Sequence, residues 1–175
     1  MKRVMVFGGS GSGKSTLACK IGAITGLPVV HIDPMYWKPG WVPRSKVETR
    51  ALVLEATARE AWVFDGNHHS TFEARIARAD HAIWLDLPTW LRMWRVSARS
   101  WRYRGQTRPD MGADCPEHFS AYFIFYWVGG YYWRSRRKDV ALMKTLPPHV
   151  NAVCLKSRRQ VAAYLGELQK RGAKA

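Results

Sequence analysis

Short apolar runs alternate in this chain with longer segments whose apolar residues recur at helical spacing. The runs predict five strands, at residues 4–7, 28–32, 62–64, 81–87 and 151–155. Strands that alternate with helices usually form a parallel sheet with both faces covered. We therefore predict one α/β domain that spans residues 1–175.

Three serines mark helix starts between these strands. Ser45 and Glu48 form a capping-box pattern, and so do Ser70 and Glu73. Each pattern predicts a helix that begins directly after its serine. Ser157 is the expected cap of a closing helix.

Two further predicted helices are rich in aromatic residues. The first covers residues 89–104, and the second covers residues 117–145 with an irregularity at Gly129 and Gly130. The first carries an apolar stripe and an arginine stripe one residue on, which are Leu91, Trp94, Ala98 and Trp101, and Arg92, Arg95, Arg99 and Arg102. For the second we favour a buried helix over a membrane-surface segment. No run reaches the ~18 apolar residues of a membrane span.

A glycine-rich loop separates the first strand from the helix that follows it. It fits the pattern G-x-x-x-x-G-K-[ST], and its residues are Gly8, Gly9, Ser10, Gly11, Ser12, Gly13, Lys14 and Ser15, with Thr16 leading into the helix. Glycines let several backbone N–H groups converge on one anion, and the helix adds its positive end. Lys14 is expected to reach the β- and γ-phosphates of a nucleotide, and Ser15 to take one Mg²⁺ position. A flexible Gly-Ser linker would not explain the flanking strand and helix.

Aspartates stand at or near the ends of three predicted strands. They are Asp33, Asp65 and Asp86. Because ligands of open parallel sheets collect at the carboxyl ends of the strands, all three could converge on the phosphate loop. One would hold Mg²⁺ through water and another would orient or deprotonate an acceptor. Turn and helix-capping roles are the alternative, and we favour function more for Asp33 and Asp65 than for Asp86.

Arginines are the candidates for neutralising a transferring phosphoryl group. Phosphoryl transfer depends mainly on positioning and charge stabilisation, and an arginine-bearing element that closes over the nucleotide also excludes water. The candidates are Arg92, Arg95, Arg99, Arg102, Arg104 and Arg108. For any single arginine a solvated basic face is the alternative; for the group we favour function.

The chain carries a formal charge of +15, from 28 Lys and Arg against 13 Asp and Glu. This excess favours anionic partners, so nucleotides, nucleic acid and anionic lipid all remain candidates. The cysteines are three and widely spaced, and the apolar run after Lys2 and Arg3 is too short for a secretory signal. We therefore expect a cytoplasmic protein without a transmembrane segment.

Several segments resemble the small P-loop kinases of the adenylate kinase and shikimate kinase type. Within these, the chain is most similar to the adenylate-kinase-related group called DNA topology modulation proteins. Besides the phosphate loop, the likeness is carried by residues 31–41, 65–67, 84–88 and 103–111. The resemblance implies a five-stranded parallel sheet of order 2-3-1-4-5. It also implies an acceptor-side segment at residues 34–60 and a mobile lid loop at residues 105–118.

The same resemblance implies roles for single residues. Asp65 with Gly66 matches the Asp-Gly of nucleoside monophosphate kinases, which implies contact with Mg²⁺ through water. Arg158 belongs to the loop that would pass close to the adenine. Asn67 stands where those kinases have an acceptor-binding arginine, and Asp33 is similar to the hydroxyl-binding acid of shikimate kinases. These departures favour a hydroxyl acceptor over AMP.

The sequence thus predicts a kinase that uses ATP and Mg²⁺ to phosphorylate a small-molecule acceptor. The expected catalytic residues are Lys14, Asp33, Arg95, Arg99 and Arg108. Two other classes stay open. One is a nucleotide-dependent protein associated with nucleic acid, as the name of the similar group suggests, and the other is a nucleotide-binding regulator with little turnover.

Overall fold

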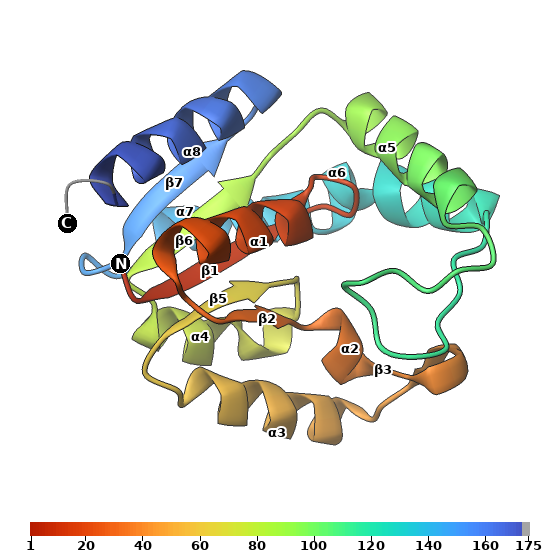
Figure 1. Ribbon diagram of the computed structural model, residues 1–175, viewed down its shortest axis with the longest axis horizontal. Coiled ribbons are helices and arrows are strands. Elements are labelled where there is room, and N and C mark those ends of the chain that lie inside the picture. Colours follow the sequence, from red (N-terminus) through yellow and green to blue (C-terminus); the bar gives the residue numbers. More distant parts are fainter. Residues whose placement is uncertain (173–175) are drawn as a thin grey trace.

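Five parallel strands form the central sheet of the structure, a computed structural model that describes residues 1–172 (Figure 1). They are β1 (Arg3–Gly8), β2 (Val29–His31), β5 (Trp62–Asp65), β6 (His81–Leu85) and β7 (Asn151–Leu155). The order across the sheet is β2-β5-β1-β6-β7, and every pairing is parallel. This confirms the predicted order 2-3-1-4-5. β1 is the central strand, and its residues from Val4 onward are therefore all buried.

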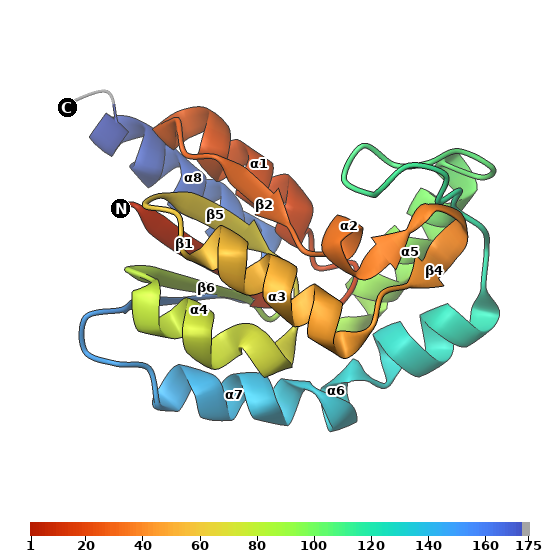
Figure 2. The same ribbon diagram turned by 90° about the horizontal axis from the view of Figure 1, so that it is seen from below.

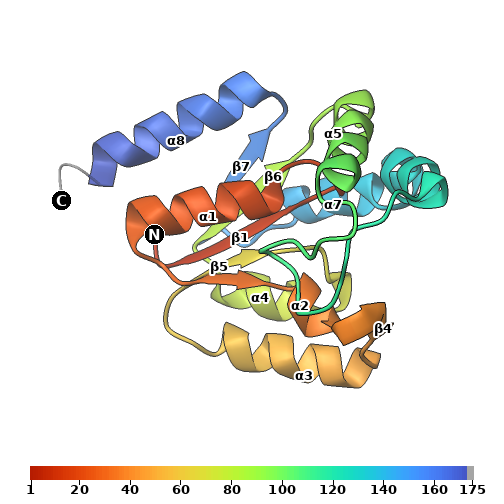
Figure 3. The same ribbon diagram turned by 45° about the vertical axis from the view of Figure 1, so that its right-hand side comes forward.

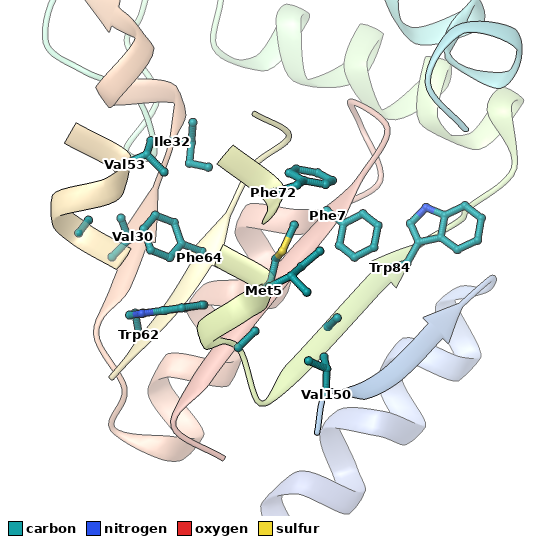
Figure 4. Packing of buried hydrophobic residues seen from close by; sticks show 14 residues of the cluster. Met5, Phe7, Val30, Ile32, Val53, Trp62, Phe64, Phe72, Trp84 and Val150 are labelled. Atoms are coloured by element: carbon teal, nitrogen blue, oxygen red, sulfur yellow. The ribbon is translucent and has the colours of Figure 1, made fainter. Parts of the chain in front are cut away.

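Helices cover both faces of this sheet (Figures 1 and 2). α1 (Lys14–Thr25) and α8 (Arg158–Gly172) lie on one face, and α3 (Lys46–Thr57), α4 (Phe72–Arg78) and α7 (Arg136–Lys144) lie on the other. On the first face Leu17 and Ile21 of α1 pack against Val4 and Val6. The second face carries the larger side chains, with Trp62 fully buried among them (Figure 4). Burial on both faces explains why the strands read as continuous apolar runs.

The acceptor-side segment contains structure that the sequence did not predict. After β2 the chain forms α2 (Asp33–Tyr36), β3 (Trp37–Lys38), the 3-10 turn η1 (Pro39–Trp41) and β4 (Val42–Pro43), and β3 pairs antiparallel with β4. Gly40 has a φ of 74°, a conformation that glycine adopts without strain, and it closes this small hairpin. The segment extends beyond the sheet on the side where the strands end (Figure 1).

Two helix starts predicted from similar patterns have different outcomes. The capping box of Ser45 and Glu48 is present and opens α3. The one predicted at Ser70 is wrong, because residues His69–Thr71 form the 3-10 turn η2 and α4 begins at Phe72. The Ser70 hydroxyl is hydrogen-bonded to His68 Nδ1 instead, at 3.0 Å.

The two aromatic helices also differ from their predictions. α5 (Thr89–Arg102) ends two residues early. The irregularity predicted at Gly129 and Gly130 is present, but residues 117–145 are not otherwise one helix: this stretch contains the π-helix η3 (Phe123–Gly129), α6 (Tyr131–Arg134) and α7. Gly130 donates its N–H to the Phe125 carbonyl, and a Cβ there would lie 2.5 Å from the Tyr126 carbonyl. The break therefore falls where only glycine fits.

Aromatic side chains on α5 and on residues 119–133 are exposed, which overturns the prediction of a buried helix. α5 packs beside η3, away from the central sheet (Figure 3). Only Ile124, Val128 and Tyr131 of the second segment are buried. We call the exposed set the aromatic face, and its members are Trp90, Trp94, Trp101, Phe119, Tyr122, Phe125, Tyr126, Trp127, Tyr132 and Trp133.

No helix within residues 1–172 is both long enough and apolar enough to cross a membrane. The three cysteines, Cys19, Cys115 and Cys154, are free thiols.

Candidate functional site

The phosphate loop bends tightly between β1 and α1. Gly8, Gly11 and Gly13 have φ angles of 137°, 79° and 93°, in the region that side chains other than glycine rarely adopt. A Cβ on Gly11 would lie 2.5 Å from the Arg92 carbonyl oxygen. α1 begins at Lys14, so its unpaired N–H groups open onto the loop. The glycines that the motif requires are thus needed for backbone conformation and for close packing.

The side chain of Asn67 fixes the start of this loop. Its Nδ2 donates to the Gly8 carbonyl at 2.6 Å, and its Oδ1 accepts from the Gly8 N–H at 3.0 Å. The amide therefore pairs with Gly8 as a neighbouring strand would. Sequence analysis noted Asn67 only as a departure from nucleoside monophosphate kinases. An amide side chain directly after a strand that neighbours β1 was the available signal.

Arginines of α5 contact the other side of the loop. Arg92 is buried and donates to the Leu87 carbonyl at 3.2 Å and to the Ser10 carbonyl at 3.5 Å. Arg95 donates to the Ser12 carbonyl at 3.1 Å. Burial lowers the pKa of both guanidinium groups, and the charge of Arg158 lowers that of Arg95 further. Arg92 and Arg95 thus lie at the loop, and a bound anion would offset the repulsion between Arg95 and Arg158.

The other two predicted catalytic arginines lie farther along, at the base of the lid loop. Arg99 and Arg108 both form ion pairs with Oε1 of the buried Glu117, at 3.3 and 2.5 Å. Arg108 also pairs with Asp110 at 3.0 Å. In this arrangement their charges are engaged by carboxylates. Sequence analysis did not identify Glu117, which it placed at the start of a helix.

The lid loop contacts the acceptor-side segment directly. The Gly40 N–H donates to the Asp114 carbonyl at 2.7 Å, and Trp41 Nε1 donates to the Pro116 carbonyl at 2.9 Å. The buried thiol of Cys115 donates to the Lys38 carbonyl at 3.5 Å. These bonds join two regions more than seventy residues apart and close one side of the site.

Asp33 is the first residue of α2 and lies between these two regions. Desolvation by the surrounding protein raises the pKa of its carboxyl group, and the positive charge of Lys14 opposes this shift. The charges of Asp65 and Asp110 raise the pKa further. The residue nevertheless remains exposed to solvent, so an acceptor can reach it.

Asp65 ends β5 next to the phosphate loop and is almost fully buried. Its Oδ2 accepts a hydrogen bond from His31 Nδ1 at 2.8 Å, and this bond is the main cause of the raised pKa of His31. Its Oδ1 is buried and has no hydrogen-bond partner within residues 1–172. His31 was not predicted as a site residue, although it ends a strand beside Asp65 in the sheet.

The site offers few protein ligands, which is typical of Mg²⁺ sites in kinases. In the described part of the chain no three His, Cys, Asp or Glu residues group as metal ligands. Mg²⁺ in kinases is held by few protein groups and otherwise by phosphates and water. The free Oδ1 of Asp65 and the half-buried hydroxyl-bearing Ser15 meet that need, and they are the residues that would hold the ion.

Asp86 has a different environment from the other two aspartates. Arg136 donates to both of its oxygens, at 2.9 and 2.7 Å. The pair lines a cavity of about 270 Å³ that also includes Arg92, Tyr131 and Lys156. Asp86 thus anchors α7 to the end of β6, and it differs from Asp33 and Asp65 in that Arg136 engages both of its oxygens.

Comparison with known proteins gave matches only among solved structures. No protein-family model and no curated protein matches the chain. A shikimate kinase from Acinetobacter baumannii in complex with shikimate is similar with a TM-score of 0.56 and 13% identity, over 99% of this chain and 94% of that chain. A gluconokinase from Sinorhizobium meliloti 1021 has a TM-score of 0.53 and 18% identity, over 97% and 94%.

A sugar kinase from Janibacter sp. HTCC2649, in an unliganded structure, has a TM-score of 0.50 and 17% identity, over 99% and 93% of the two chains. Identities this low carry information about fold and not about substrate. Together with the parallel sheet of order β2-β5-β1-β6-β7 and the phosphate loop, they show that this chain has the fold of the P-loop kinases.

Proposed function

We propose that this protein is an ATP-dependent phosphotransferase that transfers the γ-phosphate to a hydroxyl group of a small molecule. The observation that carries the proposal is the arrangement at the carboxyl edge of the sheet, where the glycine bend after β1 leads into Lys14 and Asp33 begins α2 directly after β2. A donor site and a candidate base thus lie at the same edge of the sheet. ATP and Mg²⁺ are the cofactors that such a site would use.

The chemistry assigns a separate task to each group. Lys14 and the loop N–H groups would hold the β- and γ-phosphates, and Arg95 would offset charge on the transferring group. Asp33 would accept the proton of the acceptor hydroxyl. The hydroxyl oxygen would bond to the γ-phosphorus while the bond between the γ-phosphorus and the ADP oxygen breaks. A raised pKa suits this role because it brings the carboxylate closer to the basicity of an effective general base. Bound Mg²⁺ would neutralise the β- and γ-phosphate oxygens.

Several observations favour a neutral hydroxyl over a phosphate as the acceptor. The Asp33 carboxylate would repel an anionic acceptor group, and of the two cations that act on it Arg108 is already paired with Asp110 and Glu117. Asn67 replaces the acceptor-binding arginine of nucleoside monophosphate kinases, and its side-chain amide is hydrogen-bonded to Gly8. The three similar structures are named as kinases of shikimate, gluconate and a sugar. We propose that residues 34–60 embrace the acceptor and that residues 105–118 act as the lid.

The test is a transfer assay with labelled ATP, Mg²⁺ and a panel of sugars, sugar acids, hydroxy acids, nucleosides and nucleoside monophosphates. We expect one hydroxyl acceptor to be phosphorylated, with a loss of about 10²–10³-fold in kcat for Lys14→Ala. Asp33→Asn should lower transfer while ATP binding is retained. Lys20→Ala, which removes an exposed lysine from the same helix, is the matched control.

Other outcomes of this assay would contradict the proposal. ATP hydrolysis seen only with DNA would support the nucleic-acid-associated class, to which the DNA topology modulation group belongs by name. Tight nucleotide binding without transfer or hydrolysis would support the regulator. Phosphorylation of AMP alone would retain the kinase and exclude the hydroxyl acceptor.

A further inference from the structure

The aromatic face has no role in the proposed chemistry, although it is the largest group of exposed apolar side chains on the described chain. On α5, Trp90, Trp94 and Trp101 lie within about 40° of one another around the helix axis. They are 70%, 63% and 74% exposed. Large exposed apolar patches on soluble domains mark surfaces that contact something else.

The face continues across a groove onto the neighbouring segment. A depression of about 510 Å³ lies between α5 and η3 with α6, and Met93, Phe125, Tyr126 and Trp133 contribute to its lining. Gly129 and Gly130 also line it, so two of its lining positions carry no side chain. The depression could therefore take an apolar group at the surface between the two helices.

The charge around the face selects the kind of partner. Neither α5 nor residues 119–138 contain an acidic residue, and Arg134 lines the groove and lies over the rings of Tyr126 and Trp127. Arg102, Arg137 and Lys138 are exposed. A second copy of the chain would bring like charges together, so the face favours an anionic partner with an apolar interior.

The apolar groove favours an anionic bilayer over single-stranded nucleic acid. Bases bind by stacking on free ring faces. At the groove Tyr126 stacks on Tyr122 at 4.9 Å, and the Arg134 guanidinium covers Tyr126 at 3.8 Å. Met93 and Phe125 give the groove an apolar lining beside this cation, an arrangement that suits the boundary between lipid head groups and acyl chains.

We propose that the aromatic face docks this protein onto the surface of an anionic lipid bilayer. Trp90, Trp94 and Trp133 enter the boundary between head groups and acyl chains, and Arg134, Arg137 and Lys138 contact the lipid phosphates. The opposite side of α5 carries Arg92 and Arg95 against the phosphate loop. Docking through the outer side therefore leaves the nucleotide site accessible.

The test is sedimentation of the full chain with vesicles of phosphatidylcholine alone and of equimolar phosphatidylcholine and phosphatidylglycerol. We expect binding to the anionic vesicles that is at least about tenfold stronger than to the neutral ones and weakens with salt. Brominated acyl chains should quench the tryptophan emission. The double variant Trp94→Ser with Trp133→Ser should reduce binding at least about tenfold.

Controls keep this test separate from folding and from the proposed activity. Val47→Ser removes an apolar side chain that is 79% exposed on α3, and it should leave vesicle binding unchanged. Circular dichroism and ATP binding of the double variant should equal those of the parent protein. Arg137→Gln with Lys138→Gln should lower binding to anionic vesicles and leave any neutral-vesicle binding unaltered.

Three results would overturn the proposal. The first is absence of binding to anionic vesicles, or binding that the double variant retains. The second is single-stranded DNA binding that requires Trp94 and Trp133 when vesicles do not bind. The third is a dimer, detected by sedimentation velocity, that the same double variant dissociates.

Discussion

Helices α1 and α5 both border the phosphate loop, but α1 buries only apolar residues, whereas α5 buries Arg92 together with Leu91 and Val96. α1 packs on the sheet with Leu17, Ala18 and Ile21, as its apolar spacing indicates. α5 turns Arg92 inwards and leaves Trp94 exposed. The difference comes from what each helix faces: α1 covers strands, whereas α5 faces the backbone carbonyls of the loop. An apolar stripe therefore identifies the buried face only where a helix covers a sheet.

The largest expected effect tests the α1 side of this comparison. Leu17→Ala should lower the free energy of unfolding by about 3 kcal/mol, because it removes a buried side chain and leaves a cavity against β1. Urea titration followed by circular dichroism measures the change. Lys20→Ala, on the outer side of the same helix, should change it by less than about 0.5 kcal/mol. Equal effects of the two variants would contradict the assigned orientation of α1.

The second prediction tests the inverted burial of α5. Arg92→Met should lower the free energy of unfolding by about 2 kcal/mol, since the buried Leu87 carbonyl loses its donor and Tyr131 loses the guanidinium 4.6 Å above its ring. Arg102→Met, at an exposed position of the same helix, is the matched control and should be near neutral. If Arg92→Met were stabilising, the inward arginine would not contribute to the fold.

The sheet was predictable because its signals are local. Each strand combines a short apolar run with a turn residue, and β7 even has the predicted bounds. The hairpin of β3 and β4 was missed because two-residue strands have no periodicity, and because the turn between them is held by hydrogen bonds to residues 114–116 of the predicted lid loop. Elements stabilised by distant contacts leave little trace in their own sequence.

The two serine patterns show the same limit at helix starts. Ser45 caps α3 through two local hydrogen bonds, because its hydroxyl accepts from the Glu48 N–H at 3.1 Å and its own N–H donates to the Glu48 carboxylate at 2.9 Å. At Ser70 the preceding loop is fixed by the buried Arg75, which donates to the carbonyls of Gly66 and His68 at 3.1 Å each. Desolvation lowers the pKa of Arg75 to about 9. The tertiary contact displaces the helix start, and neither Ser70 nor Glu73 reveals it.

The positions of candidate site residues could be predicted only where the residues belong to a motif or follow a predicted strand. The phosphate loop and the strand-end positions of Asp33 and Asp65 follow from spacing. Asn67 and His31 carry contacts that depend on which strands are neighbours, and Glu117 depends on how the lid folds back. From one sequence alone, the residues that these side chains contact cannot be identified.

The third prediction concerns another polar group that faces inwards, His31 at the end of β2. Its hydrogen bond to Asp65 raises the pKa of His31 above 6.5, so the folded state binds its proton more tightly than the unfolded state. The resulting stabilisation is complete below pH 6.5 and is lost as the pH rises through the folded pKa. The free energy difference between the parent protein and His31→Gln should be about 1 kcal/mol near pH 6 and should shrink towards about pH 9.

Parallel urea titrations across this pH range measure the difference. His149→Gln, at an exposed position, is the control and should show no such trend. A difference that grows as the pH rises would mean that neutral His31, not its protonated form, is the stabilising species.

The smallest expected effect is on the outer side of α5. Trp94→Ser should change the free energy of unfolding by less than about 0.5 kcal/mol, although a tryptophan at the same point of a buried stripe would cost about 3–5 kcal/mol to truncate. The reason is that the Trp94 side chain is 63% exposed, so its removal forms no cavity. Thermal unfolding monitored by circular dichroism, without lipid, measures the change. A loss near that of Leu17→Ala would show that α5 buries its tryptophans in solution, and it would remove both the inverted burial and the surface proposed for lipid docking.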